Sequence, residues 1–102
     1  GWFPDYSDAD NYLTPFFLQG GFLKNHYDNP AVDQLIQQQA TTTDASARTA
    51  LIQKIQDTVA QDLSTVPLLQ GAQVAVVGKN VQGAKDTLDA SFKFRYGALS
   101  KS

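Results

Sequence analysis

The sequence predicts the α+β fold class, with helices in the first part of the chain and strands after them. Apolar residues recur at helical spacing between residues 30 and 63, and β-branched residues cluster from residue 66 onward. Helical and strand patterns do not alternate along the chain. Because segregated helices and strands favour α+β over an alternating βαβ sheet, we expect an α+β fragment.

The first eighteen residues predict an extended start, a turn and a short helix. Pro4 disfavours helix at the residue before it, so residues 1–4 should be extended. Residues 5–11 are rich in Asp and Ser, which favour turns. Residues 11–18 carry apolar side chains at helical spacing but include Pro15, which indicates a short helix or irregular turn before the glycines of a loop.

A helix is predicted from about Pro30 to Thr41. Asn29 is a good N-cap, Pro30 suits the first helical position, and Asp33 places a negative charge in the first turns. The apolar face comprises Val32, Leu35, Ile36 and the pair Gln39/Ala40.

The next helix follows a cap at Asp44 or Thr43. Its apolar stripe is expected to comprise Leu51, Ile55, Val59 and Leu63, which recur every four residues, with Ile52 widening it. Burying each of these side chains should contribute roughly 1.5–3 kcal/mol before entropic costs. We expect this helix to dock firmly on its neighbours.

The last part of the chain predicts strands. Residues 66–69 and 74–77 are short runs rich in β-branched residues, and Pro67 ends the helical region. Phe92, Phe94 and Tyr96 alternate with polar residues, as in a half-buried strand. We expect the tail from residue 99 to 102 to be frayed.

Composition excludes several function classes. The hydrophobic fraction of 42% and the charged fraction of 18% are typical of a soluble globular protein, and no apolar run reaches membrane-spanning length. A net charge of -2 argues against a nucleic-acid partner. With no cysteine and one histidine, we expect no metal and no other cofactor.

Catalytic interpretations of the polar residues are poorly supported. His26 lies in a loop and fits a surface histidine better than a catalytic base. The spacing of Asp8 and Asp10 resembles the start of an EF-hand calcium loop, but the glycine and the glutamate that such a loop requires further along are absent. Asp5, Asp8 and Asp10 could supply a glycosidase pair only in a dry pocket, and this turn should be wet. We therefore expect no catalytic residues and no enzyme.

Trp2, Asp5 and Tyr6 instead indicate a binding site. A carboxylate between two aromatic side chains suits an ammonium group, because the carboxylate pairs with the cation and the rings supply cation–π attraction. Structural packing of the same residues is the other interpretation of this pattern.

Three blocks of residues resemble the family 5 extracellular solute-binding proteins, which include the dipeptide and oligopeptide receptors of ABC importers. Residues 2–8 are similar to the family's Trp-x-x-Asp-Tyr-x-Asp segment, and residues 25–36 look like its Tyr-x-Asn-Pro-x-Val-Asp-x-Leu-Ile helix start. Residues 48–56 with 66–68 resemble the helix and strand entry that follow. The resemblance spans nearly the whole chain.

The resemblance implies a binding module that captures peptides outside the cytoplasm and delivers them to the permease subunits of an ABC transporter. Residues 1–102 would be the C-terminal segment of a two-lobed, periplasmic-binding-protein type II-like α/β fold, with 1–65 in the second lobe and 66–102 returning toward the first. Asp5 would bind the ligand's α-amino group. Trp2, Tyr6 and Asp8 would complete the ligand-binding set.

The location implied is extracytoplasmic, either periplasmic or at the cell surface. A lipid anchor on a preceding segment would be the one attachment to a membrane, and the abrupt opening on Trp2 and Phe3 indicates that residues precede it. Two alternatives stay open. The receptor could bind another solute, such as an oligosaccharide stacked on Trp2 and Tyr6, or the segment could be a structural unit that binds nothing alone.

Overall fold

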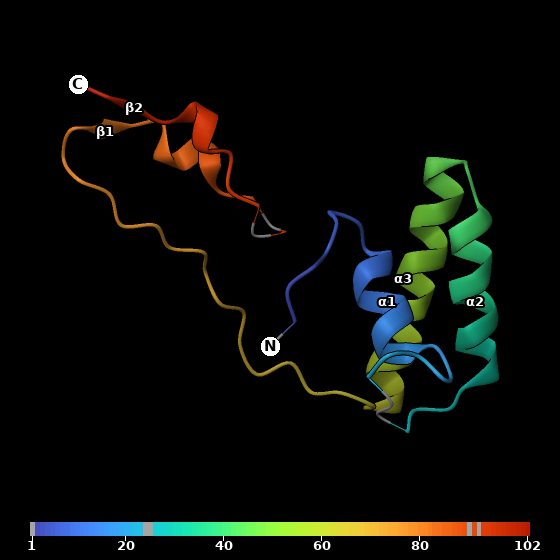
Figure 1. Cartoon of the computed structure of the whole chain (residues 1–102). Helices are drawn as coiled ribbons and strands as arrows, with labels where there is room; N and C mark the ends of the chain where they lie inside the picture. The colour runs from blue at the N-terminus through green and yellow to red at the C-terminus, as the bar shows by residue number, and fades with distance from the viewer. Residues whose placement is uncertain (1, 24–25, 90, 92) are drawn as a thin grey trace. The chain divides into compact units, whose positions relative to one another are not determined.

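The chain is a small fold of helices plus short strands, in agreement with the α+β class. The structure, a computed structural model, describes residues 2–23, 26–89, 91 and 93–102. It divides into two compact units (Figure 1). The helical unit is Asp8–Leu68, and the strand unit combines Gly1–Ser7 with Leu69–Ser102.

Three helices form the helical unit: α1 (Asp10–Phe17), α2 (Pro30–Thr41) and α3 (Ala45–Asp62). The bounds of α2 are those predicted, and Asn29 caps it by accepting hydrogen bonds from backbone N–H groups of its first turn. Asp44 caps α3 in the same way. Side-chain acceptors at both caps satisfy N–H groups that a helix start leaves open.

The short helix predicted near residues 11–18 is α1, and it contains Pro15 close to its end. Proline lacks an N–H and disrupts helix continuation, and α1 stops two residues later at Phe17. Its N-cap residue is Ala9, whose side chain cannot accept a hydrogen bond. The carboxylate of Asp8 serves instead, because its Oδ1 accepts from the backbone N–H of Asp10 at 2.8 Å.

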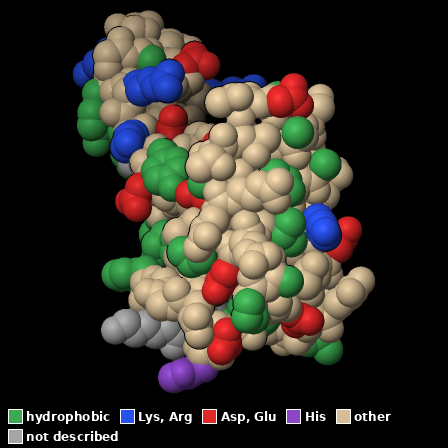
Figure 2. Space-filling view, turned by 90° about the vertical axis from the view of Figure 1, so that its right-hand side faces the viewer, with side chains coloured by type: hydrophobic (Ala, Val, Ile, Leu, Met, Phe, Trp, Pro, Cys, Tyr) green, Lys and Arg blue, Asp and Glu red, His purple; other side chains and the backbone are tan. Residues whose placement is uncertain are grey.

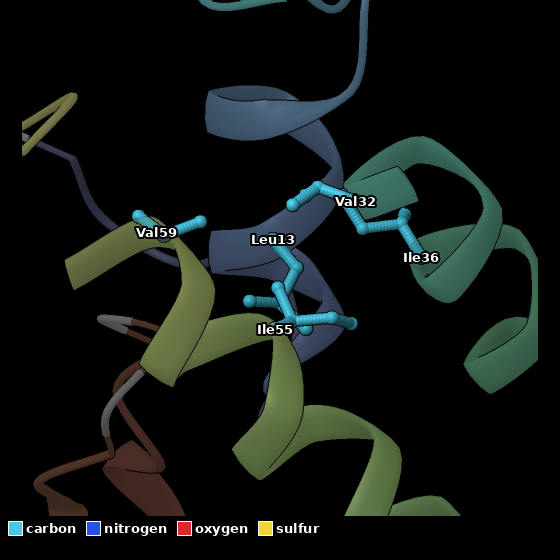
Figure 3. Packing of buried hydrophobic residues seen from close by; sticks show 5 residues of the cluster. All are labelled: Leu13, Val32, Ile36, Ile55 and Val59. Carbon is cyan, nitrogen blue, oxygen red and sulfur yellow. The ribbon is translucent and has the colours of Figure 1, made fainter. Parts of the chain in front are cut away.

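The hydrophobic core of the helical unit lies where the three helices meet. Its buried members are Leu13 from α1, Val32 and Ile36 from α2, and Ile55 and Val59 from α3 (Figure 3). Val32 and Ile55 are fully shielded from solvent. The predicted apolar faces of α2 and α3 therefore meet each other, and both cover α1.

Leu63 was wrongly placed in the apolar stripe of α3. The helix ends at Asp62, and Leu63 adopts a left-handed conformation with φ of 51° and is 74% exposed. Periodicity predicted another helical turn, but the change of backbone direction at the C-cap turns this side chain away from the core.

The strands predicted at residues 66–69 and 74–77 are wrong. Residues 66–78 form neither helix nor strand, and their apolar side chains are exposed, with Leu68 at 89% and Val76 at 95%. Figure 2 shows hydrophobic and acidic side chains interspersed on the face in view. β-Branched residues favour a strand only where another strand accepts the pairing. We call residues 66–77 the apolar run.

The strand unit has a two-stranded antiparallel ladder, in which β1 (Val81–Gln82) pairs with β2 (Ser100–Lys101). The tail was therefore wrongly expected to be frayed. Two 3₁₀ turns lie between the strands, η1 (Ala84–Thr87) and η2 (Tyr96–Ala98).

The strand predicted at residues 92–96 is also wrong for the residues described. Residues 93–95 are irregular and Tyr96 begins η2, whereas Phe92 lies outside the described residues. Phe94 and Tyr96 stack with ring centroids 6.0 Å apart, and both remain exposed. Alternation predicted that one face of this segment would be half-buried, but Phe94 is 48% and Tyr96 73% exposed.

Gly83 makes the return of β2 to β1 sterically feasible. Its φ is 79°, in the left-handed region that glycine adopts readily, and a Cβ at this position would lie 2.0 Å from the carbonyl oxygen of Ala98. Any larger residue would push apart the two segments that the ladder joins.

Candidate functional site

The predicted ammonium-binding residues Trp2, Asp5 and Tyr6 lie on the segment that opens the strand unit, Trp2 in an irregular stretch and Asp5 and Tyr6 in the bend that follows. Trp2 is half-buried, whereas Asp5 and Tyr6 are exposed. Pro4, between them, is buried and so fixes this stretch of backbone. Residues 2–6 carry one carboxylate, at Asp5, and three aromatic rings, at Trp2, Phe3 and Tyr6.

A lysine adds positive charge beside this segment. The ammonium group of Lys93 donates a hydrogen bond to the backbone carbonyl oxygen of Asp5 at 3.1 Å. The contact ties residues far apart in the sequence within the strand unit. It also means that a cationic ligand approaching Asp5 meets a nearby like charge.

Asp8, the fourth predicted site residue, belongs to the helical unit and is held by an arginine of α3. Arg48 Nη1 donates to Asp8 Oδ2 at 2.9 Å, and Arg48 Nη2 donates to Asp8 Oδ1 at 2.6 Å. Planar guanidinium and carboxylate groups match in such a two-pronged pair, which fixes orientation as well as proximity. Asp8 is therefore joined to a residue 40 positions later in the chain.

The ion pair continues into a network that we call the Arg48 cluster, made of Asp8, Asp10, Thr14, Gln39 and Arg48. Gln39 is completely buried and bridges it. Its Oε1 accepts from Arg48 at 3.0 and 3.2 Å, and its Nε2 donates to Asp10 Oδ1 at 2.5 Å. The hydroxyl of Thr14 donates to the same Asp10 oxygen at 2.8 Å. The cluster joins the start of α1 to both α2 and α3.

The cluster sets the ionisation of Asp8. The hydrogen bonds from Arg48, with the N–H of Asp10, lower the pKa of the Asp8 carboxyl from 3.8 to about 2. The same contact raises the pKa of Arg48 further above its ordinary value. A glycosidase general acid needs the opposite shift, so Asp8 does not suit that chemistry.

A second group of polar contacts joins the start of α2 to the end of α3. The Tyr27 hydroxyl donates to Asp62 Oδ2 at 2.5 Å, and Asn29 Nδ2 donates to the same oxygen at 2.8 Å. Partial burial and the hydrogen bond to Asp62 raise the pKa of Tyr27 to about 12, and the hydrogen bonds from Tyr27 and Asn29 lower the pKa of Asp62. Asn29 thus caps α2 and holds the end of α3 at once.

His26 lies beside a surface hollow of about 390 Å³ in the helical unit. Its side chain is exposed and its φ is 63°. The residues lining the hollow include Tyr27 and Asp28, and among the described lining residues there is no Ser, Thr or Cys that could act as a nucleophile.

Sequence reasoning missed the parts played by Arg48 and Gln39. A signal was present, because Gln39 falls on the apolar face of α2, seven residues after Val32 and three after Ile36. A glutamine within a buried stripe needs polar partners, and a nearby arginine and aspartates can supply them. The spacing did not reveal which aspartate Arg48 would bind.

Comparisons with known proteins place the chain near a peptide-binding protein. No family model matches the chain, and no solved structure matches it. It is 30% identical over 87 residues to "Probable di/tripeptide-binding protein 5" of Pseudomonas aeruginosa (strain UCBPP-PA14). The match covers 81% of this chain and 16% of that protein. The similarity is thus to a small portion of a binding protein.

No helix among the described residues combines the length and apolar character needed to cross a bilayer.

Proposed function

We propose that the chain is the C-terminal part of an extracytoplasmic receptor that captures peptides for an ABC importer. The observation that carries the proposal is the similarity over 87 residues to a di/tripeptide-binding protein. The grouping of Trp2, Asp5 and Tyr6 supports it, since these residue types suit a peptide's α-amino group. Peptide capture needs no bond to be made or broken.

The proposal assigns Asp5 to the ligand's ammonium group, with Trp2 and Tyr6 as the surrounding wall. The exposure of Asp5 and Tyr6 is compatible with contact to a ligand. Asp8 stays a predicted site residue, although its two carboxylate oxygens already accept hydrogen bonds from Arg48.

The proposed setting is a two-lobed receptor in which residues 1–65 belong to the second lobe and residues 66–102 return toward the first. The apolar run supports this setting, because side chains such as Leu69 and Val74 are 86% and 80% exposed and would be covered by further structure. The proposed partners are the permease subunits, and the proposed location is outside the cytoplasm.

Calorimetric titration tests the proposal on the full-length protein that contains the chain. A tripeptide and its N-acetylated form would be titrated into wild type and the Asp5→Asn variant. We expect acetylation to weaken binding at least about tenfold in wild type, because it removes a charge-assisted hydrogen bond. Asp5→Asn should weaken binding of the unmodified peptide to a similar extent.

Asp57→Asn is the matched control, since Asp57 is an exposed aspartate on α3. It should leave both affinities unchanged. A peptide affinity that changes neither on acetylation nor in Asp5→Asn would refute amine capture by Asp5. Binding of an oligosaccharide in place of peptides would refute the peptide ligand.

A further inference from the structure

We propose that Lys93 is a specificity-determining residue for the peptide site, which disfavours ligands with a basic first side chain and favours those with an acidic one. The inference rests on the proposed function, because it concerns the ligand that binds at Asp5. It adds a substrate preference that neither the motif of residues 2–8 nor the similarity to a peptide-binding protein provides.

The contact that places Lys93 lies within the strand unit. Its ammonium group donates a hydrogen bond to the backbone carbonyl oxygen of Asp5 at 3.1 Å, and both residues belong to that unit. The carboxylate oxygens of an aspartate lie at most about 5 Å from the carbonyl oxygen of the same residue. The ammonium group of Lys93 therefore lies within about 8 Å of the Asp5 carboxylate, which is close to the Debye length at physiological ionic strength.

The hydrogen bond to Asp5 leaves the charge of Lys93 in place. A carbonyl oxygen is a neutral acceptor, and an ammonium group has three N–H donors, of which this contact uses one. Lys93 is exposed, so its charged end can face a ligand in solvent.

One carboxylate within reach of Lys93 is already paired with another cation. Asp89 Oδ2 lies 3.6 Å from Arg95 Nη2. The hydrogen bonds from Ser91 lower the pKa of the Asp89 carboxyl, and the charges of Arg95 and Lys93 lower it further. Because Asp89 is shared between two cations, the three charged side chains together leave a net positive charge beside Asp5.

The first residue of a bound peptide brings its side chain next to this charge. In the proposed complex the α-ammonium group pairs with Asp5, and the side chain branches from the carbon atom that bears the ammonium group. A charge on that side chain then lies roughly 10 Å from Lys93. Two unit charges roughly 10 Å apart in water change an affinity about twofold. Lys93 should therefore repel a basic first side chain and attract an acidic one, each by about twofold.

The test is calorimetric titration of the full-length protein at low salt with the tripeptides Glu-Ala-Ala and Lys-Ala-Ala. The measured quantity is the ratio of the affinity for Glu-Ala-Ala to that for Lys-Ala-Ala. We expect Lys93→Met to lower this ratio about fourfold, because two charge interactions are lost. Lys93→Glu should lower it about sixteenfold, whereas Lys93→Arg keeps the charge and should leave it unchanged.

Comparing two of the variants separates the charge from the hydrogen bond. Lys93→Met and Lys93→Glu both remove the donor to the carbonyl oxygen of Asp5, so a further fourfold difference between them reports the charge alone. Raising the salt concentration from about 0.01 M to about 1 M shortens the Debye length from about 30 Å to about 3 Å. The ratios of all variants should then approach the wild-type ratio.

Lys101→Met is the matched control. Lys101 is an exposed lysine on β2, in the same unit as Asp5. The control makes the same change of net charge at another position and should leave the ratio close to the wild-type value.

Each outcome decides a different point. A wild type that binds neither tripeptide, or that binds their N-acetylated forms equally well, refutes the proposed function and the charge selection with it. A wild type that prefers the unacetylated peptides, with a ratio unchanged in Lys93→Met and Lys93→Glu, refutes the charge selection alone. An equal fall of the ratio in Lys101→Met also refutes it, because the net charge of the protein would then account for the effect.

Discussion

Replacing Gln39 by leucine tests whether the buried polar network stabilises the helical unit. Leucine nearly preserves the volume but removes the donor to Asp10 and the acceptor for Arg48. Losing partners of a buried polar network costs about 1–3 kcal/mol, and Thr14 still serves Asp10, so about 2 kcal/mol is expected. At an m-value of about 1 kcal/mol per molar urea, this loss lowers the unfolding midpoint by about 2 M.

The assay is urea denaturation of the chain followed by far-ultraviolet circular dichroism, which reports the three helices. Gln38→Leu is the matched control, because Gln38 is exposed on the same helix and its replacement should change stability by less than about 0.5 kcal/mol. A Gln39→Leu midpoint equal to wild type would refute the reasoning, and so would an equal loss in Gln38→Leu.

The other predictions concern a titration, the core and the charge beside Asp5. Because the pKa of Tyr27 is raised from 10 to about 12, its contribution to stability is complete below pH 10 and is lost as pH rises through 12. Tyr27→Phe should remove that alkaline fall in the unfolding midpoint, and a fall of unchanged size would contradict it. Ile55→Ala should cost about 2–5 kcal/mol in urea denaturation, whereas Leu63→Ala should change stability by less than about 0.5 kcal/mol. Equal losses of stability in the two variants would contradict the placement of Ile55 inside the core and Leu63 outside it. In the full-length protein, Lys93→Met should tighten tripeptide binding about twofold at low salt, with the gain shrinking as salt rises. Weaker binding in calorimetry would indicate that Lys93 helps to hold the ligand.

The helices were predictable because their signals are local. Asn29, Pro30 and Asp44 define helix starts through contacts within a few residues, and the structure confirms these starts. The apolar stripe that contains Ile55 and Val59 could be predicted from its spacing alone, without knowing which elements it packs against. Propensity, capping and burial pointed to the same answer there.

The strands were poorly predicted because a strand depends on a partner that its own residues do not specify. The apolar run has the composition of a strand and is irregular, whereas Ser100 and Lys101 have little strand character and pair with Val81 and Gln82. Gly83 permits that pairing through its backbone conformation, which hydrophobic periodicity cannot reveal.

The residue types of the candidate site stay a prediction, and the contacts of one of its residues, Asp8, could not be predicted from the sequence. Trp2, Asp5 and Tyr6 lie within five residues of one another in the sequence, and their place on one segment follows from that. The link from Asp8 to Arg48 spans 40 residues and depends on how α3 packs beside α1, which no local pattern encodes.

The position of the apolar run has a consequence for proteolysis. Residues 66–78 are irregular and mostly exposed, and they include the junction between Leu68 and Leu69 at which the two units divide. A protease that prefers apolar residues should cut there first and leave the core and the Arg48 cluster whole, with the helical unit still joined at Ser7–Asp8 to the strand unit. If further structure covers the apolar run, as proposed above, the same bonds would be shielded, and resistance to cleavage would report that coverage directly.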